Sequence, residues 1–69
     1  MRAIYARPFH QLPDGEWFEF FLGRAGVWVK MNRSYAYPEG TPPTEQAARA
    51  GRVYPMTRVI CRDTWAVPA

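Results

Sequence analysis

The chain has 69 residues, a formal net charge of +3, one cysteine and one histidine. This length predicts a single domain over residues 1–69 with a small core, since such a chain buries only about 60% of the surface that its unfolded form exposes. The single cysteine excludes an intrachain disulfide, and a structural zinc site, which needs about four sulfur or nitrogen ligands, is not expected. Stability must come from aromatic packing, proline-stiffened loops or self-association, which fits 16% aromatic residues and 7 prolines.

Composition also bears on location and partners. The N-terminus lacks the apolar segment of a secretory signal, and no window approaches the ~20 apolar residues of a transmembrane helix. One cysteine fits a reducing compartment, so we expect a cytoplasmic protein with no membrane partner. All but one of the 9 basic residues are arginine, which reflects either a GC-rich genome or a need for forked contacts to phosphate and carboxylate. A charge of +3 does not by itself indicate nucleic acid.

The first expected elements are a strand and a turn. Residues 3–12 contain several β-forming residues and predict a strand. Pro8 lacks a backbone N–H, which places this strand at a sheet edge or at a bulge. Residues 12–15 read Leu-Pro-Asp-Gly, a combination that predicts a tight turn.

Residues 16–35 predict a β-hairpin whose connection is residues 23–26. One register places the apolar side chains on a core face and the aromatic and charged ones on the opposite face. Its core-face pairs are Leu22–Val27, Phe20–Val29 and Phe18–Met31. Its pairs on the opposite face are Phe21–Trp28 and Glu19–Lys30. Each of these cross-strand pairs is favourable. A slip of one residue would mix the two faces, so this register is the one we expect.

The segment after the hairpin predicts less regular structure. Residues 35–43 are rich in tyrosine and proline and predict a loop, with a turn at residues 37–40. Residues 44–50 are the helical candidate, with Thr41 as the N-cap and Gly51 as the stop. At about two turns this helix could not stand alone, and a mobile loop is the alternative.

Residues 53–65 predict one long strand or two short ones, in which Arg58 and Ile60 leave one face while Val59 and Cys61 leave the other. Together the segments predict an all-β fold, a small SH3-like antiparallel barrel of four to five strands with one short helical turn. Closing the sheet in this way removes exposed edges. A three-stranded sheet with the helix packed on it is the alternative.

Part of this pattern is shared with known proteins. Residues 12–20 read L-P-x-G-x-x-F-x-F, residues 27–31 read V-W-V-K-M, and residues 33–35 read R-S-Y. This run, about a third of the chain, resembles small uncharacterised accessory proteins of bacteriophages and prophages. The resemblance implies a compact β-fold encoded by a phage accessory gene, and it carries no catalytic residue over to this chain.

No pattern in the sequence indicates an enzyme. His10 lies four residues before Asp14, but a histidine at the end of a strand needs no catalytic explanation. Cys61 precedes Arg62, and a buried structural thiol explains it better than a nucleophile does. The acidic residues show no spacing typical of acid–base catalysis, and residues 23–26 are too short for a phosphate loop. We therefore expect a non-catalytic protein with no metal and no cofactor.

The aromatic face of the hairpin is the candidate binding site. The residues expected to contact a partner are Trp17, Phe21, Trp28, Lys30, Arg24, Arg33 and Arg58. Because interface cores are enriched in aromatic residues and arginine, we expect a small binding protein that binds and modulates a host macromolecule, namely a protein. The alternative is a small β-barrel that binds single-stranded nucleic acid by base stacking, although Glu19 within the face would repel phosphate.

Two further possibilities stay open at the level of the sequence. The remainder of the chain either covers the aromatic face and makes it part of the core, or leaves it open for a partner. The small core also favours a homo-oligomer, in which copies of the chain associate through an edge strand. Each of these alternatives depends on how the hairpin sits in the sheet.

Overall fold

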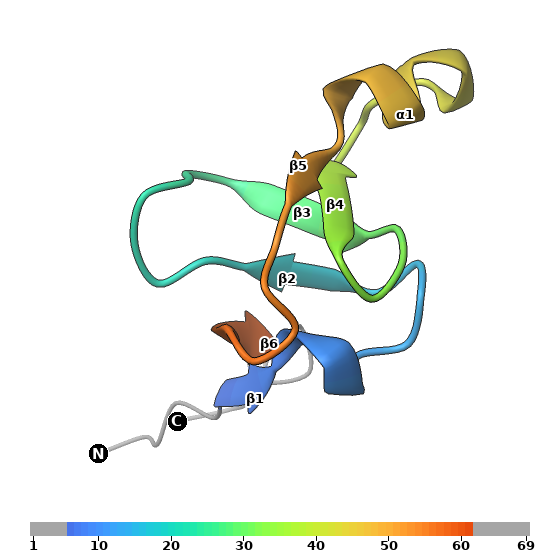
Figure 1. The fold of residues 1–69 in the computed structure, drawn as a ribbon. Coiled ribbons are helices and arrows are strands. Elements are labelled where there is room, and N and C mark those ends of the chain that lie inside the picture. The colour runs from blue at the N-terminus through green and yellow to red at the C-terminus, as the bar shows by residue number, and fades with distance from the viewer. Residues whose placement is uncertain (1–5, 62–69) are drawn as a thin grey trace.

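The computed structural model describes residues 6–61 (Figure 1). Within these residues six strands are present: β1 (Ala6–Pro8), β2 (Trp17–Glu19), β3 (Val27–Lys30), β4 (Tyr35–Pro38), β5 (Gly51–Arg52) and β6 (Arg58–Cys61). The 3-10 helix η1 (Phe9–Gln11) follows β1, and a second 3-10 helix, η2 (Pro43–Glu45), leads into the short helix α1 (Gln46–Arg49). None of these helices has the length and apolar character that crossing a membrane requires.

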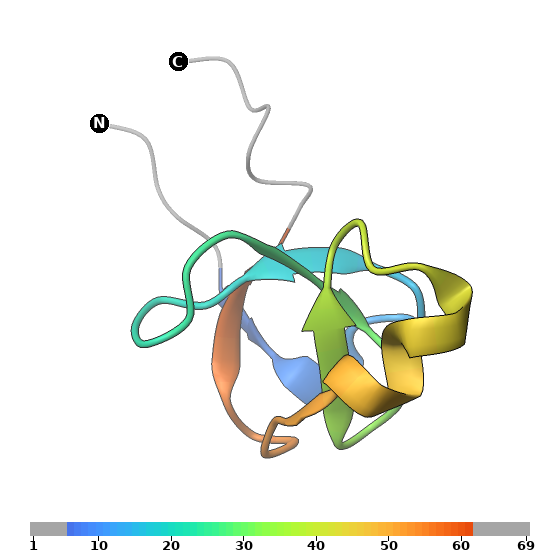
Figure 2. The same ribbon diagram turned by 90° about the horizontal axis from the view of Figure 1, so that it is seen from above.

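The six strands form one antiparallel sheet in the order β1-β6-β2-β3-β4-β5. Strands β5 and β6 follow each other in the chain but stand four positions apart in the sheet, which is ~19 Å if the sheet is flat. Residues 53–57 reach that far only when nearly fully extended. They are not, because Thr57 N donates a hydrogen bond to the Tyr54 carbonyl at 2.9 Å. The sheet must therefore curve, as Figure 2 shows.

The expected all-β antiparallel fold with one short helix is confirmed, with six strands among the described residues instead of four to five. The two edge strands, β1 and β5, do not pair with each other within residues 6–61, so the sheet is curved and open rather than clearly closed. The gap is bridged by η1, where the backbone N–H groups of Phe9 and His10 donate to the carbonyls of Thr57 (2.8 Å) and Pro55 (3.0 Å).

The core lies inside the curve of the sheet. Its buried residues are Phe9, Leu12, Phe18, Ala36, Val53, Val59 and Cys61. The ring of Phe18 stands at its centre, edge-to-face with Phe9 at 5.3 Å and with Phe20 at 5.1 Å between ring centroids. Burying a phenylalanine side chain contributes roughly 1.5–3 kcal/mol, so these few aromatic rings account for much of the stability of a small fold.

The register of β2 against β3 differs from the expected one by three residues. Glu19 pairs with Val27 and Phe18 pairs with Trp28, so the predicted pairing of Leu22 with Val27 was wrong. A shift by an odd number of residues exchanges the two faces. Trp28 therefore turns toward the core instead of the outer face. The connection also widens from residues 23–26 to residues 20–26.

Contacts outside the hairpin explain this register. Strand β6 pairs Cys61 with Phe18 and Ile60 with Glu19, which fixes the end of β2. At the other end, Gly15 N donates to the Lys30 carbonyl at 2.7 Å. Gly15 has a φ of 88°, a conformation that glycine adopts without strain. The pairing preferences of β2 and β3 alone therefore do not decide the register.

Residues 35–43 are not all loop, as the sequence suggested. Strand β4 (Tyr35–Pro38) occupies the first part and pairs with both β3 and β5. Its inward residue is Ala36, which is fully buried and small enough to fit beside Lys30, its partner on β3. Proline is usually unfavourable in a strand because it has no backbone N–H to donate. Pro38 is tolerated because it is the last residue of β4, so the expectation of a loop was misleading.

The other expected elements are largely present. The helical candidate is confirmed as η2 and α1, but Thr41 is not its N-cap, since its Oγ1 donates to the Pro38 carbonyl at 2.6 Å and Pro42 holds the cap position. Pro8 lies in the edge strand β1, as expected, and the chain then turns into η1 instead of continuing as a strand. The parts of the predicted strands at residues 3–5 and 62–65 lie outside the described residues.

Candidate functional site

The structure separates the three aromatic residues that were expected to form one platform. Trp17 pairs with Val29 on the outer face of the sheet and is 39% exposed. Trp28 packs against the core, and its Nε1 donates to the Ala25 carbonyl at 3.2 Å. Phe21 is 50% exposed in the loop between β2 and β3. These side chains therefore do not lie on one surface, and the predicted aromatic face was wrong.

Lys30 was expected on the surface, and that prediction was also wrong. Its side chain is only 5% exposed. The Nζ atom donates to Oδ1 of Asp14 at 2.5 Å and lies 5.4 Å from the centroid of the Phe9 ring. The three-residue register shift turned this side chain inward, and the ion pair compensates for its burial. Lys30 therefore fixes the turn that carries Asp14.

The three arginines of the predicted site come from separate parts of the fold. Arg33 is exposed in the turn between β3 and β4. Arg58 is exposed on β6, and its Nη1 donates to the carbonyl of Ala6 in β1 at 3.2 Å. Arg24 is half-buried in the loop between β2 and β3. The expected cluster of basic residues is thus dispersed, and Arg24 alone of these three stacks on aromatic rings within residues 6–61.

Arg24 lies over two aromatic rings that contact each other edge-to-face. Its Cζ atom lies 5.0 Å from the centroid of Phe20 and 5.2 Å from that of Trp28. The Nη2 atom donates to the carbonyl of Arg52 at 3.0 Å, which ties the loop to β5. The Nη1 atom is buried and has no acceptor within residues 6–61. Stacking thus fixes the guanidinium while part of its hydrogen-bonding capacity stays unused.

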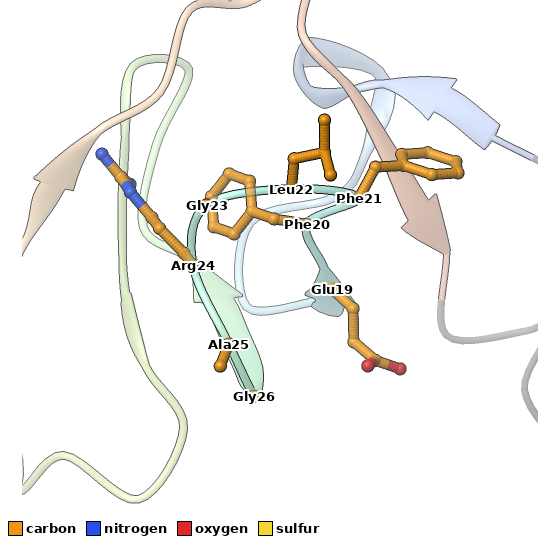
Figure 3. Close-up of a pocket in the computed structure, with 8 residues that line it drawn as sticks. All are labelled: Glu19, Phe20, Phe21, Leu22, Gly23, Arg24, Ala25 and Gly26. Carbon is orange, nitrogen blue, oxygen red and sulfur yellow. The ribbon is translucent and has the colours of Figure 1, made fainter.

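The loop that carries Arg24, residues 20–26, divides its apolar residues between the interior and the surface. Phe20 turns back onto Phe18 in the core, whereas Leu22 is 89% exposed. Gly23 has a φ of 91°, which favours glycine and reverses the chain after Leu22. In Figure 3, Phe21 and Arg24 extend to opposite sides of the loop. Residues 19–26 line an open hollow of 380 Å³.

A second hollow, here called the loop groove, lies between this loop and the connection from β5 to β6. It measures 380 Å³, and the described residues that line it are Phe20, Leu22, Gly23, Arg24, Arg52, Val53, Tyr54 and Thr57. Tyr54 is 69% exposed, and the Cζ atom of Arg52 lies 5.5 Å from the centroid of its ring. The groove therefore combines exposed apolar side chains with two guanidinium groups.

Sequence reasoning missed most of this groove. Leu22 was assigned to the core face of a strand. It is exposed because β2 ends at Glu19, which leaves Leu22 in the loop. Tyr54 was not considered, although the Pro55 beside it indicated a break in the strand. Arg52 was counted only as one of many arginines. The pattern R-x-Y at residues 52–54, before a proline, is the signal that could have drawn attention to this segment.

The metal-ligating side chains and the single cysteine were the other candidates for a site. No group of three His, Cys, Asp or Glu side chains within residues 6–61 is placed to hold a metal ion. Cys61 is buried, with its Sγ 4.0 Å from the Val59 carbonyl. The chain matches no protein-family model, and comparison with curated proteins and with solved structures gives no match. The loop groove is therefore the basis for a functional argument.

Proposed function

We propose that this chain is a small, non-catalytic binding protein that docks a partner protein on the loop groove. The observation that carries the proposal is the exposure of Leu22 (89%) and Tyr54 (69%) on opposite walls of one groove. Large apolar side chains that are exposed side by side mark interaction surfaces, whereas isolated ones are normal. Phe21 and Met56, which are 50% and 71% exposed, neighbour the two walls in the chain but do not line the groove.

The composition of the groove favours a protein over other macromolecules. Aromatic residues and arginine, both of which line the groove, are enriched at the centre of protein interfaces. Arginine and tyrosine are also enriched among the residues that dominate binding energies. Arg24 is already fixed by stacking on Phe20 and Trp28, so little conformational entropy is lost when a partner contacts it. A phage origin and a host protein as the partner stay predictions that rest on the resemblance of residues 12–35.

Capture from a bacterial lysate tests the proposal with matched variants. The tagged chain is compared with Leu22→Ser and Tyr54→Ser, which remove the apolar walls, and with Ala47→Ser, an exposed change in α1. We expect a defined protein band that survives nuclease treatment, persists with Ala47→Ser and is lost with both groove variants. Circular dichroism confirms that each variant is folded. A band that both groove variants retain, or no band at all, would contradict the proposal.

A small barrel that binds single-stranded nucleic acid is the alternative function. Tyr54 with Arg52 above its ring offers a stacking surface beside a cation. Its signature is an affinity for a fluorescent oligothymidylate that falls steeply as salt rises, because phosphate contacts release counterions. The burial of Lys30 and the separation of Trp17 from Trp28 leave fewer contacts for this mode. We therefore expect weak binding of this probe.

Self-association is the other alternative, and it requires a second copy of the chain on the same groove or on an edge strand. Sedimentation at two protein concentrations distinguishes it from binding of another protein. We expect the same monomeric species at both concentrations. A mass that rises with concentration, and that falls again in Leu22→Ser, would assign the groove to a dimer of this chain instead.

A further inference from the structure

We propose that the loop groove recognises an acidic peptide segment in which a carboxylate side chain lies close to a large apolar one. This inference rests on the proposed function and adds the chemistry of the partner. Three observations carry it: the uncompensated charge of the groove, the exposed guanidinium of Arg52 and the presence of an apolar side chain and a cation on each wall.

The charge of the groove is positive and unbalanced. Arg24 and Arg52 line it, and none of the described lining residues is acidic. Within residues 6–61 the ion pairs are Lys30–Asp14 and Arg49–Glu45, so neither groove arginine has an acidic partner there. Two cations of like sign beside one apolar hollow are complementary to a carboxylate, since opposite potentials across an interface determine partner choice.

The two guanidinium groups of the groove differ in how open they are to a ligand. For Arg24 the hydrogen bond described is from Nη2 to the Arg52 carbonyl. Its Nη1 has no acceptor within residues 6–61, but this atom is buried, so a ligand in the groove does not reach it. Arg24 therefore contributes a fixed positive charge to the groove. The exposed Arg52 supplies the fork of N–H donors that a carboxylate accepts with two parallel hydrogen bonds.

The two walls repeat one arrangement. In the loop, Leu22 stands two positions before Arg24, and in the other wall Tyr54 stands two positions after Arg52. Each wall thus offers one exposed apolar side chain and one guanidinium. The walls therefore fit a segment that carries both an acidic and a large apolar side chain.

The same features disfavour a nucleic acid in this groove. Leu22 is the most exposed of its large apolar residues, and an aliphatic side chain provides no stacking surface for a base. Two arginines also make few phosphate contacts compared with the basic tracks of proteins that bind single strands. A peptide uses both the aliphatic wall and the cations.

Selection from a display library of random peptides on the immobilised protein tests the inference without assuming a sequence. We expect enriched peptides that carry Asp or Glu within a few positions of Leu, Ile or Phe. The most enriched peptide is then synthesised in its acidic form and with each acid replaced by its amide. In fluorescence anisotropy, we expect the amide form to bind about tenfold or more weakly, since hydrogen bonds between two charged groups are the strong ones.

Matched variants assign the binding to the groove. Arg52→Gln removes one guanidinium but leaves the backbone carbonyl that accepts from Arg24, and it should weaken the acidic peptide about tenfold. Arg7→Gln removes an exposed arginine on β1, outside the groove, and serves as the control for net charge. It should leave the affinity unchanged. Equal losses in both variants would show a non-specific charge effect and overturn the inference.

The remaining outcomes separate this inference from the proposed function. Enriched peptides that are neutral or basic, or an amide form that binds as well as the acidic form, overturn the acidic specificity. If such peptides still depend on Leu22 and Tyr54, the proposed docking of a protein stands. No enrichment overturns the peptide inference, and capture from lysate then decides the proposed function alone. An oligothymidylate that displaces the peptide and binds more tightly assigns the groove to nucleic acid instead.

Discussion

Each end of the β2–β3 hairpin holds a cation, but only one of the two cations has an acidic partner within residues 6–61. At the end near Gly15, Lys30 is 5% exposed and forms an ion pair with Asp14 at 2.5 Å. At the other end, Arg24 lies over the rings of Phe20 and Trp28, and its buried Nη1 has no acceptor within residues 6–61. The first end is also tied by backbone hydrogen bonds between β3 and residues 15 and 16. The second end opens into a seven-residue loop, residues 20–26.

Under the proposed function, this difference separates the residues that hold the fold from those that would contact a partner. A buried charge whose partner is present belongs to the architecture, because removing the partner would leave that charge uncompensated. A fixed cation without an acidic partner, beside an exposed leucine and tyrosine, is what the proposed docking of a partner protein requires. Four tests, taken from the largest expected effect to the smallest, show where this boundary lies.

The largest effect is expected in the core that both ends share. Phe18→Ala removes the ring that contacts Phe9 and Phe20, which should lower the free energy of unfolding by about 3–5 kcal/mol. A 69-residue domain has a total stability of only roughly 3–10 kcal/mol, so much of the protein should be unfolded. Urea denaturation followed by tryptophan fluorescence measures this. A loss below about 1 kcal/mol would place the core elsewhere.

At the closed end, Asp14→Ala leaves the Lys30 ammonium buried without its partner. We expect the free energy of unfolding to fall by about 2–3 kcal/mol. Adding Lys30→Met should restore most of this loss, because methionine keeps the apolar stem against Phe9 and removes the charge. The pair is measured as a double-mutant cycle in urea. If the second substitution adds to the damage, the ion pair does not have the structural role assigned to it.

Between the two ends, Gly51 provides the space for Arg24. A Cβ atom at this position would lie 3.0 Å from Nη1 of Arg24. Gly51→Ala should therefore displace the guanidinium and lower the free energy of unfolding by about 1 kcal/mol. It should also change the chemical shift of the Arg24 Nε–Hε group in a nitrogen–proton NMR spectrum. An unchanged Arg24 signal would mean that the guanidinium is not fixed against Gly51.

At the open end, Arg24→Met should change stability little. The variant loses the stacked cation and the hydrogen bond to the Arg52 carbonyl, each worth about 1 kcal/mol. It also removes a buried donor without an acceptor, whose presence costs about 1–3 kcal/mol. The two effects roughly cancel, so urea denaturation should show a change within about 1 kcal/mol. A loss as large as that of Asp14→Ala would make Arg24 a structural cation like Lys30.

The parts of the fold that sequence reasoning found depend on local patterns. The alternation of Arg58 and Val59 in β6 is confirmed, with Arg58 exposed and Val59 fully buried. The helical segment, expected at residues 44–50 and found at residues 43–49, also follows from local signals, with Gly51 as the expected stop, although the expected N-cap was wrong. These features repeat every two residues or occupy one turn, so neighbouring residues are enough to specify them.

The candidate site depended on a register that is fixed by a distant strand. β6 pairs with β2 from more than forty residues away and sets where β2 ends. This moved Leu22 from the expected core face to the surface and Lys30 from the surface to the core. The expected register kept Lys30 on the surface. In the structure its burial is compensated by the ion pair with Asp14 and by the contact of its ammonium with the Phe9 ring. Interactions between distant segments of this kind are not visible in the pairing preferences of one hairpin.

The most direct test of the comparison is the free energy of unfolding of the double variant Phe21→Ser/Leu22→Ser, measured in urea beside Asp14→Ala. The two substituted side chains are 50% and 89% exposed. We expect the double variant to stay within about 0.5 kcal/mol of the wild type, while Asp14→Ala loses about 2–3 kcal/mol. If the double variant loses as much as Asp14→Ala, these apolar residues serve the fold, and the open end of the hairpin is not a free binding surface.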